Sequence, residues 1–127
     1  MPRLDAIGVI VSDMERAIDF YQRVGLEFAD ISDDVHAEAT GPGGIRVMLD
    51  TEASVMSFSD WQPPTGGMSR TALAFLCDSP AEVDRMFDEL VSAGGRGHLP
   101  PFDAPWRQRY ASVHDHDGNA VDLFAPL

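Results

Sequence analysis

The sequence predicts an α+β fold in which two β-α-β-β-β modules make one domain of 127 residues. The first observation is an internal repeat, because the pattern of residues 6–28 returns in residues 72–94. The second is that each copy begins with a short apolar segment, typical of a buried strand, and continues into a helical pattern. We expect the domain to span 1–127, with modules at about 1–57 and 68–127 joined by a loop around 51–70.

The predicted helix of each copy has a start signal, an apolar stripe and an end signal. Asp13 and Ser79 are good N-cap residues, and Pro80 suits the first helical position. In the first copy, Ser12 with Glu15 offers an alternative start one residue earlier. Gly25 and the pair Gly94-Gly95 suit the helix ends, where a left-handed residue is favoured. Apolar residues recur between these signals at helical spacing, and we expect them to pack on the sheet. These residues are Ala17, Phe20, Tyr21, Val24, Val83, Met86, Phe87 and Leu90.

After each helix the residues alternate between apolar and polar, as strands with one buried face do. The alternation covers 35–40, 45–50, 110–114 and 121–124. Turns are predicted at Gly41-Pro42-Gly43-Gly44 and at 115–119. The segment 51–70 and the segment 102–106 both contain prolines, and we expect both to be loops.

Composition and charge exclude several classes of protein. Hydrophobic residues are 44% and charged residues 24%, as in a globular protein. Nine Lys and Arg against 21 Asp and Glu give a net charge of −12, which disfavours nucleic acid as a partner. The charge favours solubility, or else attraction of a cationic small molecule. No apolar run reaches the ~20 residues of a membrane helix, and because an acidic residue comes early in the sequence we expect no secretory signal. Since Cys77 is the single cysteine, no internal disulfide can form, and we expect a cytoplasmic protein.

Two segments resemble the vicinal oxygen chelate superfamily, which includes glyoxalases, extradiol dioxygenases, and fosfomycin- and bleomycin-resistance proteins. VSDMERAIDFYQRVGLEF is similar to the first strand–helix unit of that family. RYASVHDHDGNAVDLFAPL is similar to its closing hairpin, with His116 at a position where proline is usual. The resemblance covers nearly the whole chain. It implies the glyoxalase/bleomycin-resistance fold, in which paired βαβββ modules form a curved, cup-like mixed sheet, and it implies a homodimer.

The resemblance also indicates where the metal ligands of the family would stand. The four positions hold Ala6, Met48, Ala72 and Asp122. Only the last of these can bind a divalent cation, whereas a stable site needs three or four ligands. We therefore expect no metal and no cofactor. The alternative is a displaced metal site, for which the sequence offers His36, Glu38, His114 and Asp122.

The strand alternation also predicts which side chains point away from the helices, and these are the candidate ligand-binding residues. Aromatic residues of the two predicted loops are expected at the rim of the pocket, where they would stack on a planar or cationic ligand. The alternative for a loop tryptophan is to cover the core. The candidates are His36, Glu38, Arg46, Met48, Asp50, Trp61, Phe102, Trp106, Tyr110, His114 and Asp122.

These residues favour a metal-free protein that binds, and thereby sequesters, an aromatic or cationic small molecule. The alternative is a lyase, isomerase or dioxygenase-like enzyme of the same superfamily, using a His/Asp pair with Tyr110 for acid–base chemistry, with or without a displaced divalent metal. A dimeric scaffold with a vestigial pocket is the third hypothesis. The sequence assigns no catalytic residue. We expect Cys77 to be a small buried hydrophobe, and His98 and His116 to be solvated.

Overall fold

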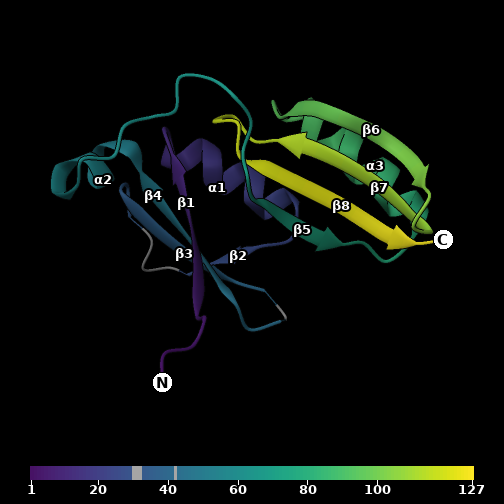
Figure 1. The fold of residues 1–127 in the computed structure, drawn as a ribbon, viewed down its shortest axis with the longest axis horizontal. Helices are drawn as coiled ribbons and strands as arrows, with labels where there is room; N and C mark the ends of the chain where they lie inside the picture. The colour runs from purple at the N-terminus through teal and green to yellow at the C-terminus, as the bar shows by residue number, and fades with distance from the viewer. Residues whose placement is uncertain (30–32, 42) are drawn as a thin grey trace. The chain divides into compact units, whose positions relative to one another are not determined.

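The computed structural model describes residues 1–29, 33–41 and 43–127, and Figure 1 shows its ribbon. The described chain forms two compact units, Met1–Gly67 and Met68–Leu127, here called unit one and unit two. Each unit has its own four-stranded mixed sheet, and within the described residues neither sheet closes into a barrel. The α+β class and the two β-α-β-β-β modules are confirmed. That the two units make one domain stays a prediction.

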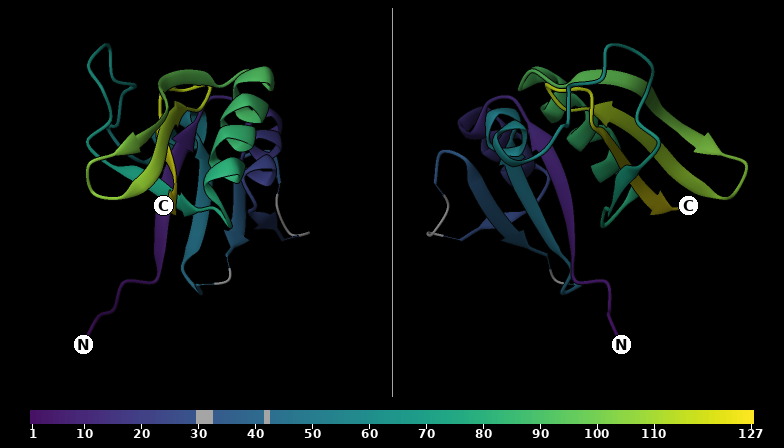
Figure 2. Two further views of the ribbon diagram at one scale, coloured as in Figure 1. Left: turned by 90° about the vertical axis from the view of Figure 1, so that its right-hand side faces the viewer. Right: turned by 60° about the vertical axis from the view of Figure 1, so that its left-hand side comes forward.

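Unit one has the strand order β1-β4-β3-β2, with β1 parallel to β4 and the other neighbours antiparallel. Its elements are β1 (Ala6–Val11), α1 (Met14–Arg23), β2 (Glu27–Phe28), β3 (His36–Thr40), β4 (Arg46–Thr51) and α2 (Glu52–Phe58). Helix α1 lies along one face of this sheet (Figure 2). Phe20 and Tyr21 of α1 are fully buried, as are Ala37 and Leu49 of the strands beneath them. The predicted stripe of α1 is therefore the core of unit one.

Unit two repeats this arrangement with the strand order β5-β8-β7-β6, and β5 is parallel to β8. Its elements are β5 (Ala72–Leu76), α3 (Pro80–Ser92), β6 (Arg96–Ala104), β7 (Gln108–His114) and β8 (Ala120–Pro126). Helix α3 packs on β6, β7 and β8 from one side (Figures 1 and 2). Val83 and Leu90 of α3 are fully buried, together with Val113 and Leu123 of the sheet. Met86 and Phe87 of the same stripe are half-buried.

The predicted helix starts and ends are confirmed, and α1 uses Asp13, not the alternative Ser12, as its N-cap. The Asp13 side chain accepts a hydrogen bond of 3.0 Å from the backbone N–H of Arg16, and Ser79 does the same for Glu82 at 3.1 Å. Gly25 and Gly94 follow the C-caps of α1 and α3 with φ of 108° and 106°. A residue with a side chain is strained in that conformation, so glycine ends both helices.

Two segments differ from the sequence prediction. The expected loop 51–70 begins with helix α2, because Thr51 caps it by accepting a hydrogen bond from the N–H of Ser54. The expected loop 102–106 is wrong for its first three residues, which belong to β6. This strand tolerates Pro100 and Pro101 because it lies at the sheet edge, and its pairing with β7 shifts register on both sides of Leu99.

The predicted turns lie between antiparallel strands. Gly44 donates its backbone N–H to the carbonyl of Gly41, while Pro42 of the predicted turn lies outside the described residues. In the second turn, the Asp115 carboxylate accepts hydrogen bonds from the backbone N–H groups of Asp117 and Asn119. His116 in that turn is half-buried and packs on Gly94, so the expectation that it is solvated is wrong.

None of the helices in the described ranges is both long enough and apolar enough to span a membrane.

Candidate functional site

Each sheet has one face covered by a helix and one face opposite it, and the predicted site residues of the strands lie on the opposite faces. In unit one, the register pairs His36 with Asp50, and Glu38 with Met48, so these side chains share the face opposite α1. In unit two, Tyr110 pairs with Phe124 and Ser112 with Asp122, which places them on the face opposite α3. The alternation therefore predicts the side-chain directions correctly.

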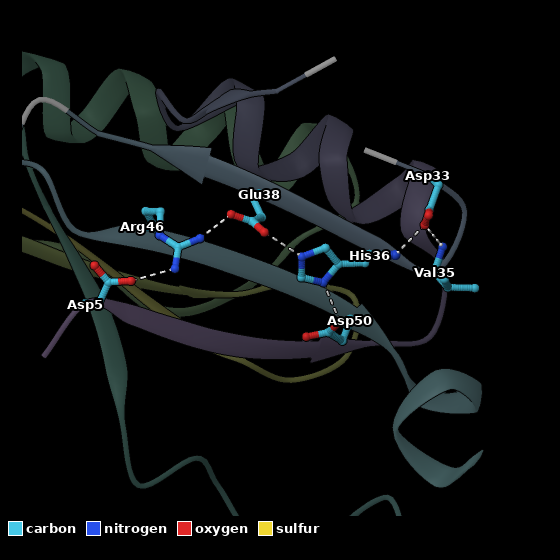
Figure 3. A network of polar contacts seen from close by, with 7 residues as sticks. All are labelled: Asp5, Asp33, Val35, His36, Glu38, Arg46 and Asp50. Atoms are coloured by element: carbon cyan, nitrogen blue, oxygen red, sulfur yellow. Dashed lines mark hydrogen bonds and ion pairs between the residues drawn. The ribbon is translucent and has the colours of Figure 1, made fainter. Parts of the chain in front are cut away.

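A chain of ion pairs and hydrogen bonds crosses the face opposite α1 (Figure 3). The imidazole of His36 lies between two carboxylates, with Nδ1 at 2.6 Å from Asp50 Oδ1 and Nε2 at 2.9 Å from Glu38 Oε2. The other oxygen of Glu38 accepts a hydrogen bond from Arg46. Arg46 also reaches Asp5, at 2.6 Å. The charges thus alternate in sign along the network when His36 is protonated.

This alternation changes the proton affinities of the network. The hydrogen bond with Glu38, followed by that with Asp50, raises the pKa of His36 above its usual value. His36 in turn, with help from Arg46, lowers the pKa of the Glu38 carboxyl. Asp5 and Glu38 raise the pKa of Arg46. Each charge is therefore compensated by its neighbours, and both ring nitrogens of His36 are engaged.

Asp33 sets the start of β3, where His36 stands. Its carboxylate accepts hydrogen bonds of 2.9 Å from the backbone N–H groups of Val35 and His36, and these bonds lower the pKa of Asp33 (Figure 3). Neither Asp33 nor Asp5 was among the sequence candidates. The Asx-turn position of Asp33, two residues before Val35, was the available signal, while Asp5 lies before the first strand and carried none.

Three aromatic rings meet on the face opposite α3. Trp106 lies 5.4 Å from Tyr110 and 6.1 Å from Phe102, and Phe102 lies 6.4 Å from Tyr110, measured between ring centroids. All three contacts are edge-to-face. Trp106 is 54% exposed, and its indole N–H donates to Gln108 Oε1 at 3.0 Å. We call Phe102, Trp106 and Tyr110 the aromatic cluster.

A carboxylate adjoins this cluster. The hydroxyl of Tyr110 donates a hydrogen bond to Asp122 Oδ2. Burial is the largest cause that raises the pKa of Tyr110, to about 12, and the hydrogen bond with Asp122 is the next largest. The phenol therefore keeps its proton near neutral pH. In the described part of the chain, no Arg or His side chain forms an ion pair with Asp122. The carboxylate is therefore held by a neutral donor.

His114 marks the other end of the same face. His114 is 3% exposed, and its ring stacks on that of the exposed His98, with centroids 4.6 Å apart and planes at 20°. Arg96 donates a hydrogen bond of 2.8 Å to His114 Nδ1. Burial lowers the pKa of His114, and the positive charges of His98 and Arg96 lower it further. His98 is exposed, but the contact with His114 was missed, because the register shift in β6 breaks the simple alternation.

Met48, Trp61 and Cys77 form none of the side-chain contacts described above. Met48 is half-buried on the face opposite α1 and pairs in register with Gly8 and Glu38. Trp61 is half-buried after α2, where its backbone N–H donates to Ser59 Oγ. Cys77 is buried, and burial raises its pKa, as expected for a small buried hydrophobe.

The residues at the metal-ligand positions of the family do not fit a metal ion. Ala6, Met48 and Ala72 offer no nitrogen or oxygen side-chain ligand. Among the described residues, no three His, Cys, Asp or Glu side chains group in a way that could hold one. His36, of the displaced-site hypothesis, uses both ring nitrogens for carboxylates.

Comparison with known proteins bears on the whole chain. It is similar to a glyoxalase/bleomycin resistance protein/dioxygenase family enzyme from Burkholderia phytofirmans PsJN, with 18% identity, a TM-score of 0.84, and 99% of this chain and 100% of that chain covered. A glyoxalase-related enzyme from Fulvimarina pelagi has 19% identity and a TM-score of 0.83, covering 98% and 88%. A superfamily member from Sphaerobacter thermophilus DSM 20745 has 25% identity and a TM-score of 0.70, covering 98% of both chains.

No curated protein sequence matches this chain significantly. The family model that describes the glyoxalase/bleomycin resistance protein/dioxygenase superfamily, in contrast, matches residues 3–123. Because this match covers nearly the full length of the chain, the chain belongs to this superfamily.

Proposed function

We propose that this protein binds a small aromatic cation on the face of unit two opposite α3, and that it sequesters the compound without metal and without turnover. The observation that carries the proposal is the position of Asp122 beside the aromatic cluster. Its carboxylate is bound by the neutral Tyr110 hydroxyl and forms no ion pair in the described chain. A carboxylate in this state favours a ligand that brings the missing positive charge.

The aromatic cluster supplies the second half of the recognition. Trp106 offers an exposed indole, and a planar cation that stacks on it gains both apolar burial and the cation–π attraction. Phe124 pairs in register with Tyr110 and with Leu76, which is 66% exposed, so apolar surface continues beside the rings. The net charge of −12 attracts cations from solution over a longer range.

Other residues support the remaining parts of the proposal. A metal-free protein is supported by Ala6, Met48 and Ala72 at three family ligand positions. The single cysteine, Cys77, suits a cytoplasmic protein. Sequestration in place of turnover is supported by Tyr110, since its raised pKa keeps the phenol protonated near neutral pH, where it donates to Asp122 and does not act as a general base.

A second candidate function is acid–base catalysis at His36, which the 2.6 Å contact with Asp50 favours because it orients the imidazole. The Glu38 carboxylate, however, holds the nitrogen that would face a substrate. Long incubation of the protein with a bound probe separates the two functions. Recovery of the unchanged probe supports sequestration, and a protein-dependent product supports catalysis.

The central experiment is a fluorescence titration with the planar cation proflavine. The Trp61→Phe variant leaves Trp106 as its single tryptophan, so any quenching reports the aromatic cluster. We expect saturable quenching by proflavine and none by 1-naphthalenesulfonate. In the same background, Asp122→Asn should weaken binding about tenfold or more, as expected for a lost charge-assisted contact.

The matched control is Asp88→Asn, which removes the same charge from the exposed side of α3. It should leave the dissociation constant for proflavine within about twofold of the parent, because an exposed distant charge is largely screened. Equal weakening by the two variants would reduce the effect to net charge. The absence of saturable quenching by proflavine would overturn the proposed function.

A further inference from the structure

Arg96 differs from the other arginines that the strands and helices of unit two position. Arg85 and Arg109 form ion pairs with Glu82 and with Asp84 and Asp103. The hydrogen-bond partner of Arg96 is the neutral imidazole of His114, and no carboxylate in the described ranges forms an ion pair with it. In a chain with 21 acidic residues, a guanidinium on a strand beside two histidines and without an acidic partner in the described ranges is a candidate site for an anion.

The imidazole strengthens that site by its tautomer. Arg96 can only donate, so His114 Nδ1 accepts, and the ring proton of the neutral imidazole stands on Nε2. The pair therefore offers donors, namely the remaining guanidinium N–H groups and one imidazole N–H. His98 stacks on His114 and holds that ring in place. A carboxylate or a phosphate oxygen matches this set of donors.

The register places the anion site on the same face as the aromatic cluster. Tyr110, Ser112 and His114 follow one another on the face of β7 opposite α3, and Arg96 pairs with His114. Gly97, the next residue of β6, faces α3, since an added Cβ there would meet Phe87 at 2.8 Å. Asp122 pairs with Ser112, in the middle of the row. Asp122 and Arg96 lie on the two strands that flank β7, level with Ser112 and with His114. Two residues along a strand span about 7 Å and two strand spacings about 10 Å, so the backbones of Asp122 and Arg96 are about 12 Å apart on this face.

We propose that the ligand of this face is a zwitterion: a planar aromatic cation that also carries a carboxylate, which Arg96 and His114 bind. The inference rests on the proposed function, which assigns the cationic part to Asp122 and Trp106. The inference adds an anionic group to the ligand and thereby sets the orientation of the ligand along β7. The two halves of the ligand then neutralise charges of opposite sign on one sheet.

The test compares two dyes that differ at one group. Rhodamine 110 carries a xanthylium cation and a free carboxylate, and rhodamine 123 is its methyl ester. We expect the protein to bind rhodamine 110 about tenfold more tightly, as one charge-assisted pair allows. Arg96→Gln should abolish this preference by weakening rhodamine 110 alone. Arg85→Gln, which removes the same charge from α3, should keep the preference.

The outcomes separate this inference from the proposed function. Equal affinity of both dyes for the unaltered protein, or a preference that survives in Arg96→Gln, overturns the anion site and leaves cation binding intact. Failure of both dyes and of proflavine to bind overturns the proposed function itself. Circular dichroism of Arg96→Gln verifies that the variant folds. Should it not fold, His98→Ala offers the second test, since loss of its stacking on His114 should reduce the preference as well.

Discussion

His36 on β3 and Asp50 on β4 stand directly opposite each other, and the Nδ1 of the imidazole lies 2.6 Å from the Oδ1 of the carboxylate. The contact joins side chains of two neighbouring strands, which the ion pair of Glu38 with Arg46 also links. A charged imidazole in this place ties β3 to β4 on the face opposite α1, and a neutral one does so less strongly.

The first prediction concerns the pH dependence of stability. The folded pKa of His36 is raised, so its stabilising contribution is present below the unfolded value of about 6.5 and is lost as the pH rises through the folded pKa. The free energy of unfolding of the natural protein should therefore exceed that of His36→Gln most near pH 6, and the difference should shrink at pH 9. Urea unfolding at both pH values measures it. The variant retains His114, whose lowered pKa acts in the opposite direction, so the comparison isolates His36.

The second prediction separates backbone strain from a steric clash. Gly25 and Gly94 have nearly the same positive φ, of 108° and 106°. A Cβ at Gly25 meets nothing within 4 Å, whereas at Gly94 it would lie 2.6 Å from His116 Nε2. Gly25→Ala should cost about 1–2 kcal/mol of unfolding free energy, and Gly94→Ala distinctly more.

The double variant Gly94→Ala with His116→Ala removes the clash and keeps the strain. Relative to His116→Ala alone, it should lose about as much stability as Gly25→Ala does relative to the natural protein. Equal losses for the two single alanine variants would show that His116 moves aside without cost.

The third prediction concerns the thiol. Cys77 is 6% exposed, and burial raises its pKa, so little of the reactive thiolate reaches solvent. We expect Ellman's reagent to react with the folded protein far more slowly than with the protein in 6 M guanidinium chloride. A rate in the folded state that matches the denatured rate would place the thiol at the surface.

The fourth prediction is a homodimer. Each unit has one sheet face that its long helix, α1 or α3, does not cover, and the family resemblance implies paired modules. Light scattering at micromolar concentration should give twice the single-chain mass of 13.9 kDa. The single-chain mass itself would show that one chain covers its own sheets.

The strands and helices of this chain are predictable because the local signals agree with one another. Asp13 and Ser79 cap the helices, Gly25 and Gly94 end them, and the alternation around Ala37 and Leu49 gives the buried face. Helix α2 was missed because Thr51 is also the last residue of a strand, and the prolines and glycines after Trp61 suggested a loop for the entire segment.

The candidate site was only partly predictable for a physical reason. Strand periodicity assigns His36, Asp50, Tyr110 and Asp122 to a face, but it does not show which of them touch. The stacking of His98 on His114 depends on an irregular register in β6, and a strict two-residue period cannot predict such an irregularity. That no carboxylate of the described chain pairs with Arg96 depends on the positions of the acidic side chains in the folded chain, which local sequence patterns do not give.

The two prolines of β6 have a consequence for how this protein behaves at high concentration. An exposed edge of nine residues would be a template onto which another chain could add a strand, and such addition leads to fibrils. Adjacent residues of a strand point their N–H groups to opposite sides, so Pro100 and Pro101 remove one donor on each side. The N–H donor that is missing on the side of β7 falls at the register shift between Leu99 and Phe102, where the ladder is already interrupted. The N–H donor that is missing on the outer side interrupts the row of donors along the free edge. This interruption protects the longest strand of the described chain from amyloid-like pairing.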